Sequence, residues 1–124
     1  MQSRAAPTDQ HVRLSLWAAD LADSVLDLFR RERPSDPRPQ AAIAAARAWA
    51  TGDISTADAL RAARDSQAAA QECTSLSATA AAQCAGHAAA TAHVARHADA
   101  AEGFMNKALG AVRRDDLSPP ATAG

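Results

Sequence analysis

Apolar side chains recur every three or four positions along most of this chain, which is the spacing of one face of an α-helix. The clearest example lies within residues 9–32, where acidic residues fall mainly on the other faces. The pattern predicts an amphipathic helix over Asp9–Glu32. The stripe expected to face the core consists of Leu14, Trp17, Leu21, Val25 and Leu28.

Turn-forming residues divide the following sequence into two further helical segments. Three prolines within residues 33–39 force an extended or turning link. A second helix is expected over residues 39–51, because a proline suits its first turn and Gly52 is a typical C-terminal breaker. A third helix is expected to begin at the capping sequence of residues 55–58 and to reach about residue 73.

The polar residues 74–77 offer caps for a fourth helix, which we expect to reach at least His97. Residues 99–102 resemble a second helix start, so a break or kink is expected near Ala98. A fifth helix would carry the apolar residues Phe104, Met105, Ala108, Leu109 and Val112.

No segment alternates apolar and polar residues with period two, so the predicted fold is all-α: an Ala-rich bundle of four to five helices. We expect one domain over residues 9–112, with flexible tails at 1–8 and 113–124. Alanine supplies 36 of the 59 hydrophobic residues, so the core is shallow and relies on close helix contacts or on an oligomer interface. A homo-oligomer, with a dimer favoured, is therefore expected. Trp17 and Trp49 are the expected core anchors.

The charges argue against nucleic acid and membranes as partners. The net charge is −1, acidic and basic residues are interspersed, and Lys107 is the single lysine. No signal peptide is recognisable, and no apolar run approaches the roughly 20 residues of a membrane span. Cys73 and Cys84 do not form a disulfide pattern, so we expect free thiols and a cytoplasmic location.

Three of the four histidines lie within the twelve residues 86–97, in otherwise small, helix-favouring sequence. On one straight helix, His93 and His97 share a face with Gly86, while His87 points elsewhere. His87 and His97 would then be about 15 Å apart at roughly 1.5 Å per residue. The three imidazoles could not share one ion, so neither a metal site nor a cofactor is expected.

Two roles stay open for His87, which falls on the face that also holds Val94 and Met105. It is either a neutral, buried histidine bonded to a neighbouring helix, or a polar group that lines a ligand cavity or acts as a general base. His93 is expected at a helix contact. If the protein has a catalytic activity, His87 and His93 are the residues expected to carry it. His11 lies in a first helical turn and gives no functional signal.

Other residues complete the set of binding candidates. Asp36 and Arg38 are expected to cap and orient the second helix, or else Arg38 binds an anionic group. Cys84 is expected to act as a small hydrophobic residue, because no acid–base partner stands at a fixed spacing. The full set of ligand-binding candidates is His87, Thr91, His93, His97, Trp49, Arg38, Asp36 and Gln67.

Several motifs resemble the Imm-5-like family of immunity proteins, which are common in actinobacteria. The resemblance runs from Leu14 to Leu109 and is strongest over residues 85–95, AGHAAATAHVA, with His97 following. It also covers LWAAD at 16–20, VLDLF at 25–29, RPSDPRP at 33–39, AAIAAARAW at 41–49 and GDI at 52–54. The resemblance implies a helical protein that binds and neutralises a toxin domain or a toxic small molecule without catalysis.

The chain departs from the family pattern at two places. It has Ser66–Gln67 where members tend to carry a histidine, and Phe104–Met105–Asn106 where they tend to carry an aromatic Tyr-Ala pair. The alternative to a binding protein is a small helical enzyme or ligand-binding protein of secondary metabolism, with His87 and His93 lining an interhelical pocket. A buried polar cavity at His87 would favour that alternative or sequestration of a small molecule. A solid core with an exposed apolar patch would favour a protein partner.

Overall fold

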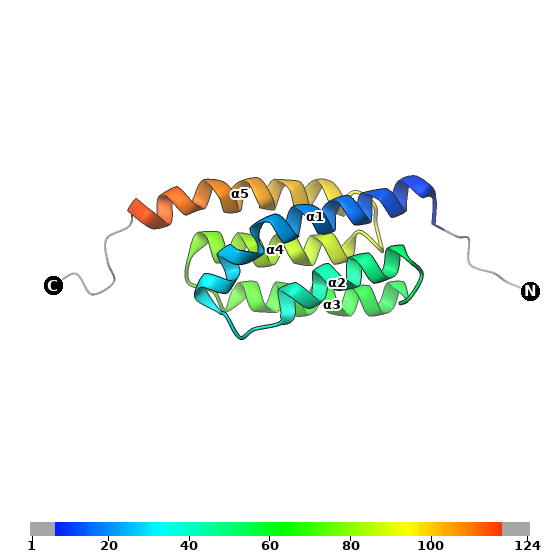
Figure 1. Ribbon diagram of the computed structural model, residues 1–124, viewed down its shortest axis with the longest axis horizontal. Coiled ribbons are helices and arrows are strands. Elements are labelled where there is room, and N and C mark those ends of the chain that lie inside the picture. The colour runs from blue at the N-terminus through cyan, green and yellow to red at the C-terminus, as the bar shows by residue number, and fades with distance from the viewer. Residues whose placement is uncertain (1–6, 118–124) are drawn as a thin grey trace, which may run out of the picture.

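The computed structural model describes residues 7–117 and confirms an all-α bundle with no strand in this range (Figure 1). None of the helices in this range combines the length and apolarity of a membrane-spanning segment. Five helices follow one another along the chain: α1 Asp9–Glu32, α2 Arg38–Ala50, α3 Thr56–Gln71, α4 Leu76–Ala90 and α5 His97–Leu117.

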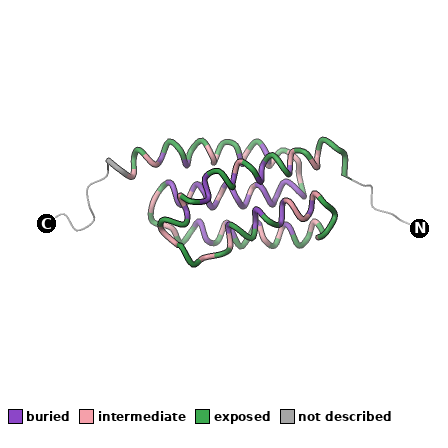
Figure 2. Tube along the Cα trace, viewed as in Figure 1, coloured by how far each residue is buried: buried purple, intermediate pink, exposed green. Residues whose placement is uncertain are grey.

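Helix α4 lies at the centre of the bundle and contacts each of the other four helices. Eleven of its fifteen residues are buried. The trace of this helix is therefore largely purple in Figure 2. A helix that is surrounded in this way needs small apolar residues on all sides, because large side chains would hold its neighbours away. The Ala-rich sequence of α4 meets this need.

The predicted inner face of α1 is displaced around the helix. Helix α1 buries a row of mainly small residues on α4, while Leu14, Leu21 and Leu28 are half-buried beside the contact. Trp17 is 36% exposed, so the prediction that it anchors the core is wrong. Close approach of the helix backbones favours the small residues at the contact, and the large ones lie on its flank. The buried residues of α1 are Ser15, Ala18, Ala19, Ala22, Val25, Leu26 and Phe29.

Trp49 is 8% exposed, which confirms that it is buried. Gly52, which follows shortly after the end of α2, has a φ of 82°, a backbone conformation that favours glycine. Helix α3 begins where its cap was expected, because the Ser55 side chain accepts a hydrogen bond from the Asp58 N–H at 3.1 Å.

The predicted end of the fourth helix is wrong. Helix α4 ends at Ala90, and residues 91–96 reverse the chain before α5 begins at His97. Backbone hydrogen bonds between residues three apart, as in a 3₁₀-helix, tighten this turn. They include the bonds from Ala92 N–H to Ala89 O and from His93 N–H to Ala90 O. No glycine or proline marks the turn in the sequence.

Helix α5 continues to Leu117, so the helical domain extends past its expected end at residue 112. Residues 1–6 and 118–124 of the two expected tails lie outside the described residues.

Candidate functional site

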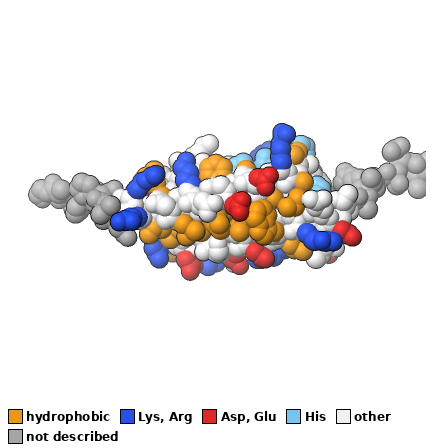
Figure 3. All heavy atoms as spheres, turned by 90° about the horizontal axis from the view of Figure 1, so that it is seen from above, with side chains coloured by type: hydrophobic (Ala, Val, Ile, Leu, Met, Phe, Trp, Pro, Cys, Tyr) orange, Lys and Arg blue, Asp and Glu red, His pale blue; other side chains and the backbone are white. Residues whose placement is uncertain are grey.

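All four histidines lie at one end of the bundle. The antiparallel arrangement brings the starts of α1, α3 and α5 together with the ends of α2 and α4 (Figure 1). His11 is in the first turn of α1, His87 in the last turn of α4, His93 in the following link and His97 at the start of α5. Figure 3 shows histidine side chains at this end of the surface over α1 and α5.

His87 and His97 form a direct pair, with their Nδ1 atoms 3.0 Å apart. The expected separation of about 15 Å rested on a straight helix of roughly 1.5 Å per residue. The chain reversal at residues 91–96 instead folds α5 back along α4 and brings the two rings together. One ring donates its Nδ1–H to the other, since two bare nitrogens would repel.

Aromatic packing and burial fix the state of this pair. The Phe104 ring stacks on His87 with centroids 5.0 Å apart and an angle of 10° between the planes. Burial, followed by repulsion from His97, lowers the pKa of His87. Burial also lowers the pKa of His97, with further repulsion from His93 and Arg96. Both rings therefore stay neutral at a pH where an exposed histidine begins to take up a proton.

His93 does not join the pair. The prediction that it sits at a helix contact is wrong, because it lies in the link after α4 and is exposed. With the helix ended at Ala90, His93 and His97 no longer share a helix face.

A second group at the same end contains two of the candidates, Trp49 and Thr91. They meet through His11, which sequence reasoning dismissed. The His11 Nε2 atom lies 2.5 Å from the Thr91 carbonyl oxygen, and its ring centroid lies 4.7 Å from that of Trp49. Trp49 and His11 line an open hollow of about 300 Å³ with Ile54, Thr56 and other residues. No local pattern could have found this contact, because His11 and Thr91 are 80 residues apart.

Gln67 belongs to the contact between α3 and α4. Its Nε2 donates to the Gln83 carbonyl at 3.3 Å. A Cβ atom added at Gly86 would lie 2.4 Å from the same Nε2. Gly86 therefore leaves room for the Gln67 side chain.

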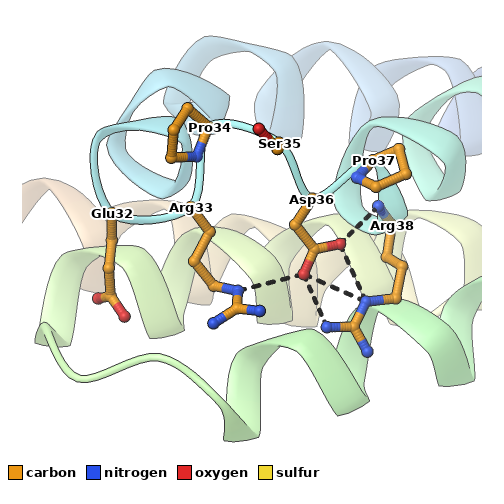
Figure 4. A pocket seen from close by; sticks show the side chains of 7 residues that line it. All are labelled: Glu32, Arg33, Pro34, Ser35, Asp36, Pro37 and Arg38. Atoms are coloured by element: carbon orange, nitrogen blue, oxygen red, sulfur yellow. Dashed lines mark hydrogen bonds and ion pairs between the residues drawn. The ribbon is translucent and has the colours of Figure 1, made fainter.

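Asp36 and Arg38 meet at the opposite end of the bundle (Figure 4). The Arg38 guanidinium donates to Asp36 at 2.7 Å and to Glu72 at 2.9 Å. Arg33 donates to the same two carboxylates, and Asp36 also accepts the Arg38 backbone N–H at 3.1 Å. These bonds, those from the Arg38 side chain above all, hold the pKa of Asp36 well below its usual range.

This arrangement fits the capping role of Asp36 and Arg38 better than anion binding by Arg38. Both carboxylate partners already occupy the guanidinium donors of Arg38. The adjacent open hollow of about 520 Å³ is lined by the loop residues 32–38. Glu72 and Arg33 were missed as partners, since only the fold brings the end of α3 beside this loop.

The best-formed surface hollows lie away from the paired histidines. Four well-formed hollows in the described part of the chain have linings that do not include His87, His93 or His97. Cys84 is buried as expected, and burial raises the pKa of its thiol to about 12. Burial therefore disfavours the thiolate form that a nucleophilic cysteine needs.

Large apolar side chains gather along α1 and α5 (Figure 3). Trp17 and Leu109 are 36% and 54% exposed. The two helices contact each other, and Leu28 and Val112 line a common hollow. Met105 and Leu109 lie seven and three residues before Val112, on the same flank of α5. We call this surface the apolar band: Leu14, Trp17, Leu21, Leu28, Met105, Leu109 and Val112.

Comparison with known protein families identifies the fold family. The family described as Imm-5 like putative immunity protein matches residues 4–119. The chain belongs to this family. No curated protein and no solved structure matches it.

The two departures from the Imm-5 like pattern can now be placed. Ser66 is buried, and its hydroxyl donates to the Ala82 carbonyl at 2.8 Å. Phe104 is the ring that stacks on His87. The first departure therefore lies in the contact between α3 and α4, and the second lies beside the histidine pair.

Proposed function

We propose that this immunity-family protein neutralises a toxin domain by binding it, and that the apolar band is the contact surface. The observation that carries the proposal is the exposure of two large apolar side chains of this band, Trp17 and Leu109. Exposed apolar patches mark protein interaction sites, and tryptophan is enriched among the residues that dominate binding energy.

The family and the surface hollows support a protein partner over a small molecule. An immunity protein needs a toxin to bind, and His87 does not line any of the four hollows described above. An enzyme with His87 and His93 in a pocket would need such access, and His93 lies apart from His87 in the link. Binding in the cytoplasm, with Cys73 and Cys84 as free thiols, completes the proposal.

Paired substitutions test the contact surface. The probe is a purified candidate toxin domain, and the readouts are its Kd and protection of cells that express it. Trp17→Gln and Leu109→Gln should each weaken binding about tenfold or more, as expected for buried anchors at an interface. Leu76→Gln is the matched control, because Leu76 is 51% exposed at the start of α4, outside the band.

Three results would contradict the proposal. The first is a Kd that changes equally in all three variants. The second is tight binding of a small toxic molecule with no affinity for the toxin domain. The third is a dimer, seen by sedimentation velocity, that Trp17→Gln and Leu109→Gln convert to monomer, because the band would then be covered by a second copy.

A further inference from the structure

The paired histidines have a second chemical capacity that neither the family nor the apolar band explains. Their Nδ1 atoms face each other at 3.0 Å across the contact of α4 with α5. Two nitrogens bound to one metal ion, each at about 2.0–2.1 Å, lie roughly 2.8–3.4 Å apart, from the angle of about 90° in square-planar or octahedral sites to the angle of about 109° in tetrahedral zinc sites. The observed separation falls within this interval.

We propose that His87 and His97 form a two-histidine binding site for a divalent transition metal ion of the Zn²⁺, Ni²⁺ or Cu²⁺ class. Imidazole nitrogen is a preferred ligand of these ions. The ion replaces the hydrogen bond between the two rings: it lies to one side of the line that joins the two Nδ1 atoms, and both rings turn so that these atoms point at it. The ring that donated the Nδ1 proton carries it on Nε2 instead. No net proton is released when both rings start neutral.

The site is pre-organised for such an ion. Phe104 stacks on His87, and the turn after α4 fixes the backbone, because the Thr91 hydroxyl donates to the His87 carbonyl at 3.0 Å.

Two protein ligands leave the coordination sphere open. Among residues 7–117 no three histidine, cysteine, aspartate or glutamate side chains gather to hold an ion together. Water fills the remaining positions. Arg96 and the Lys107 ammonium, which lies 5.7 Å from the Phe104 centroid, add positive charge nearby and weaken the attraction for a cation.

Calorimetric titration of the full chain with Ni²⁺ and with Zn²⁺ tests the site. The wild-type protein should bind one equivalent, and the metal should raise its Tm. His97→Gln and His87→Gln should each weaken the affinity at least tenfold. His93→Gln is the matched control and should change it less than twofold, because His93 is exposed in the link.

A further variant checks the placement of the ion. Arg96→Gln removes a positive charge beside His97 and should strengthen binding severalfold. If the His87→Gln variant does not fold, the His97→Gln variant still tests the site, because His97 is half-exposed. The proposal is overturned if the wild-type chain binds neither metal, if His97→Gln binds as the wild type does, or if His93→Gln loses as much affinity as His97→Gln.

Discussion

At the scale of single residues, the Gln67 side chain packs tightly over Gly86. Its missing side chain lets Gln67 lie across α4 and reach the Gln83 carbonyl. Elsewhere in a helix interior, replacing glycine by alanine stabilises the fold by about 1 kcal/mol. At Gly86 the contact of the new methyl group with Gln67 opposes this gain.

We expect Gly86→Ala to destabilise the fold by about 1 kcal/mol. The new methyl group would displace Gln67 and break its hydrogen bond, which together cost more than the gain of about 1 kcal/mol in helix propensity. Urea unfolding measures the change. In a Gln67→Ala background the same substitution should instead stabilise the protein, because the obstructing side chain is gone. Destabilisation of equal size in both backgrounds would show that Gln67 is not the obstacle.

At the scale of helices, the start of α4 depends on two neighbours. The Glu32 carboxylate, at the end of α1, accepts the N–H groups of Thr74 and Ser75 at 2.8 and 2.9 Å. Asp115 of α5 accepts the N–H groups of Leu76 and Ser77. The start of the central helix is thus capped by one carboxylate from α1 and one from α5.

These caps predict a pH-dependent stability. Burial opposes ionisation of Glu32, but the hydrogen bonds from Ser75 and Thr74 together lower its pKa. A carboxyl with a lowered folded-state pKa stabilises the protein above its unfolded pKa of about 4, and this contribution is lost as the pH falls further. Glu32→Gln should therefore cost about 1 kcal/mol at pH 7 and much less at pH 3.

Urea unfolding at both pH values measures the difference. Asp27→Asn is the control, since Asp27 is exposed and forms an ion pair at 3.4 Å with Arg30, one turn further along the same helix. A cost of Glu32→Gln that is the same at pH 3 and pH 7 would contradict the capping role.

At the scale of the whole molecule, the sequence was most informative where polar caps and apolar spacing agree. Helix α1 spans the predicted Asp9–Glu32, with Thr8 capping its start. The end of α4 could not be predicted, because no glycine or proline marks the turn at residues 91–96. This error had a large consequence, because the turn at residues 91–96 brings His87 into contact with His97.

The candidate site depended on contacts that local patterns do not contain. His11 reaches Thr91 across 80 residues, and Glu72 reaches Arg38 across 34. Apolar spacing also misplaced the inner face of α1, because it gives weight to large residues whereas this bundle packs on alanine. The apolar band has the same origin: the large residues of α1 that were expected to face the core lie beside the helix contact instead.

The most direct test of the proposed function is amide hydrogen exchange of the protein with and without the same candidate toxin domain. Binding through the apolar band should slow exchange in α1 around residues 14–28 and in α5 around residues 105–112, and leave α3 unchanged. Slower exchange confined to α3, or to residues 87–97 at the histidine end, would contradict the account.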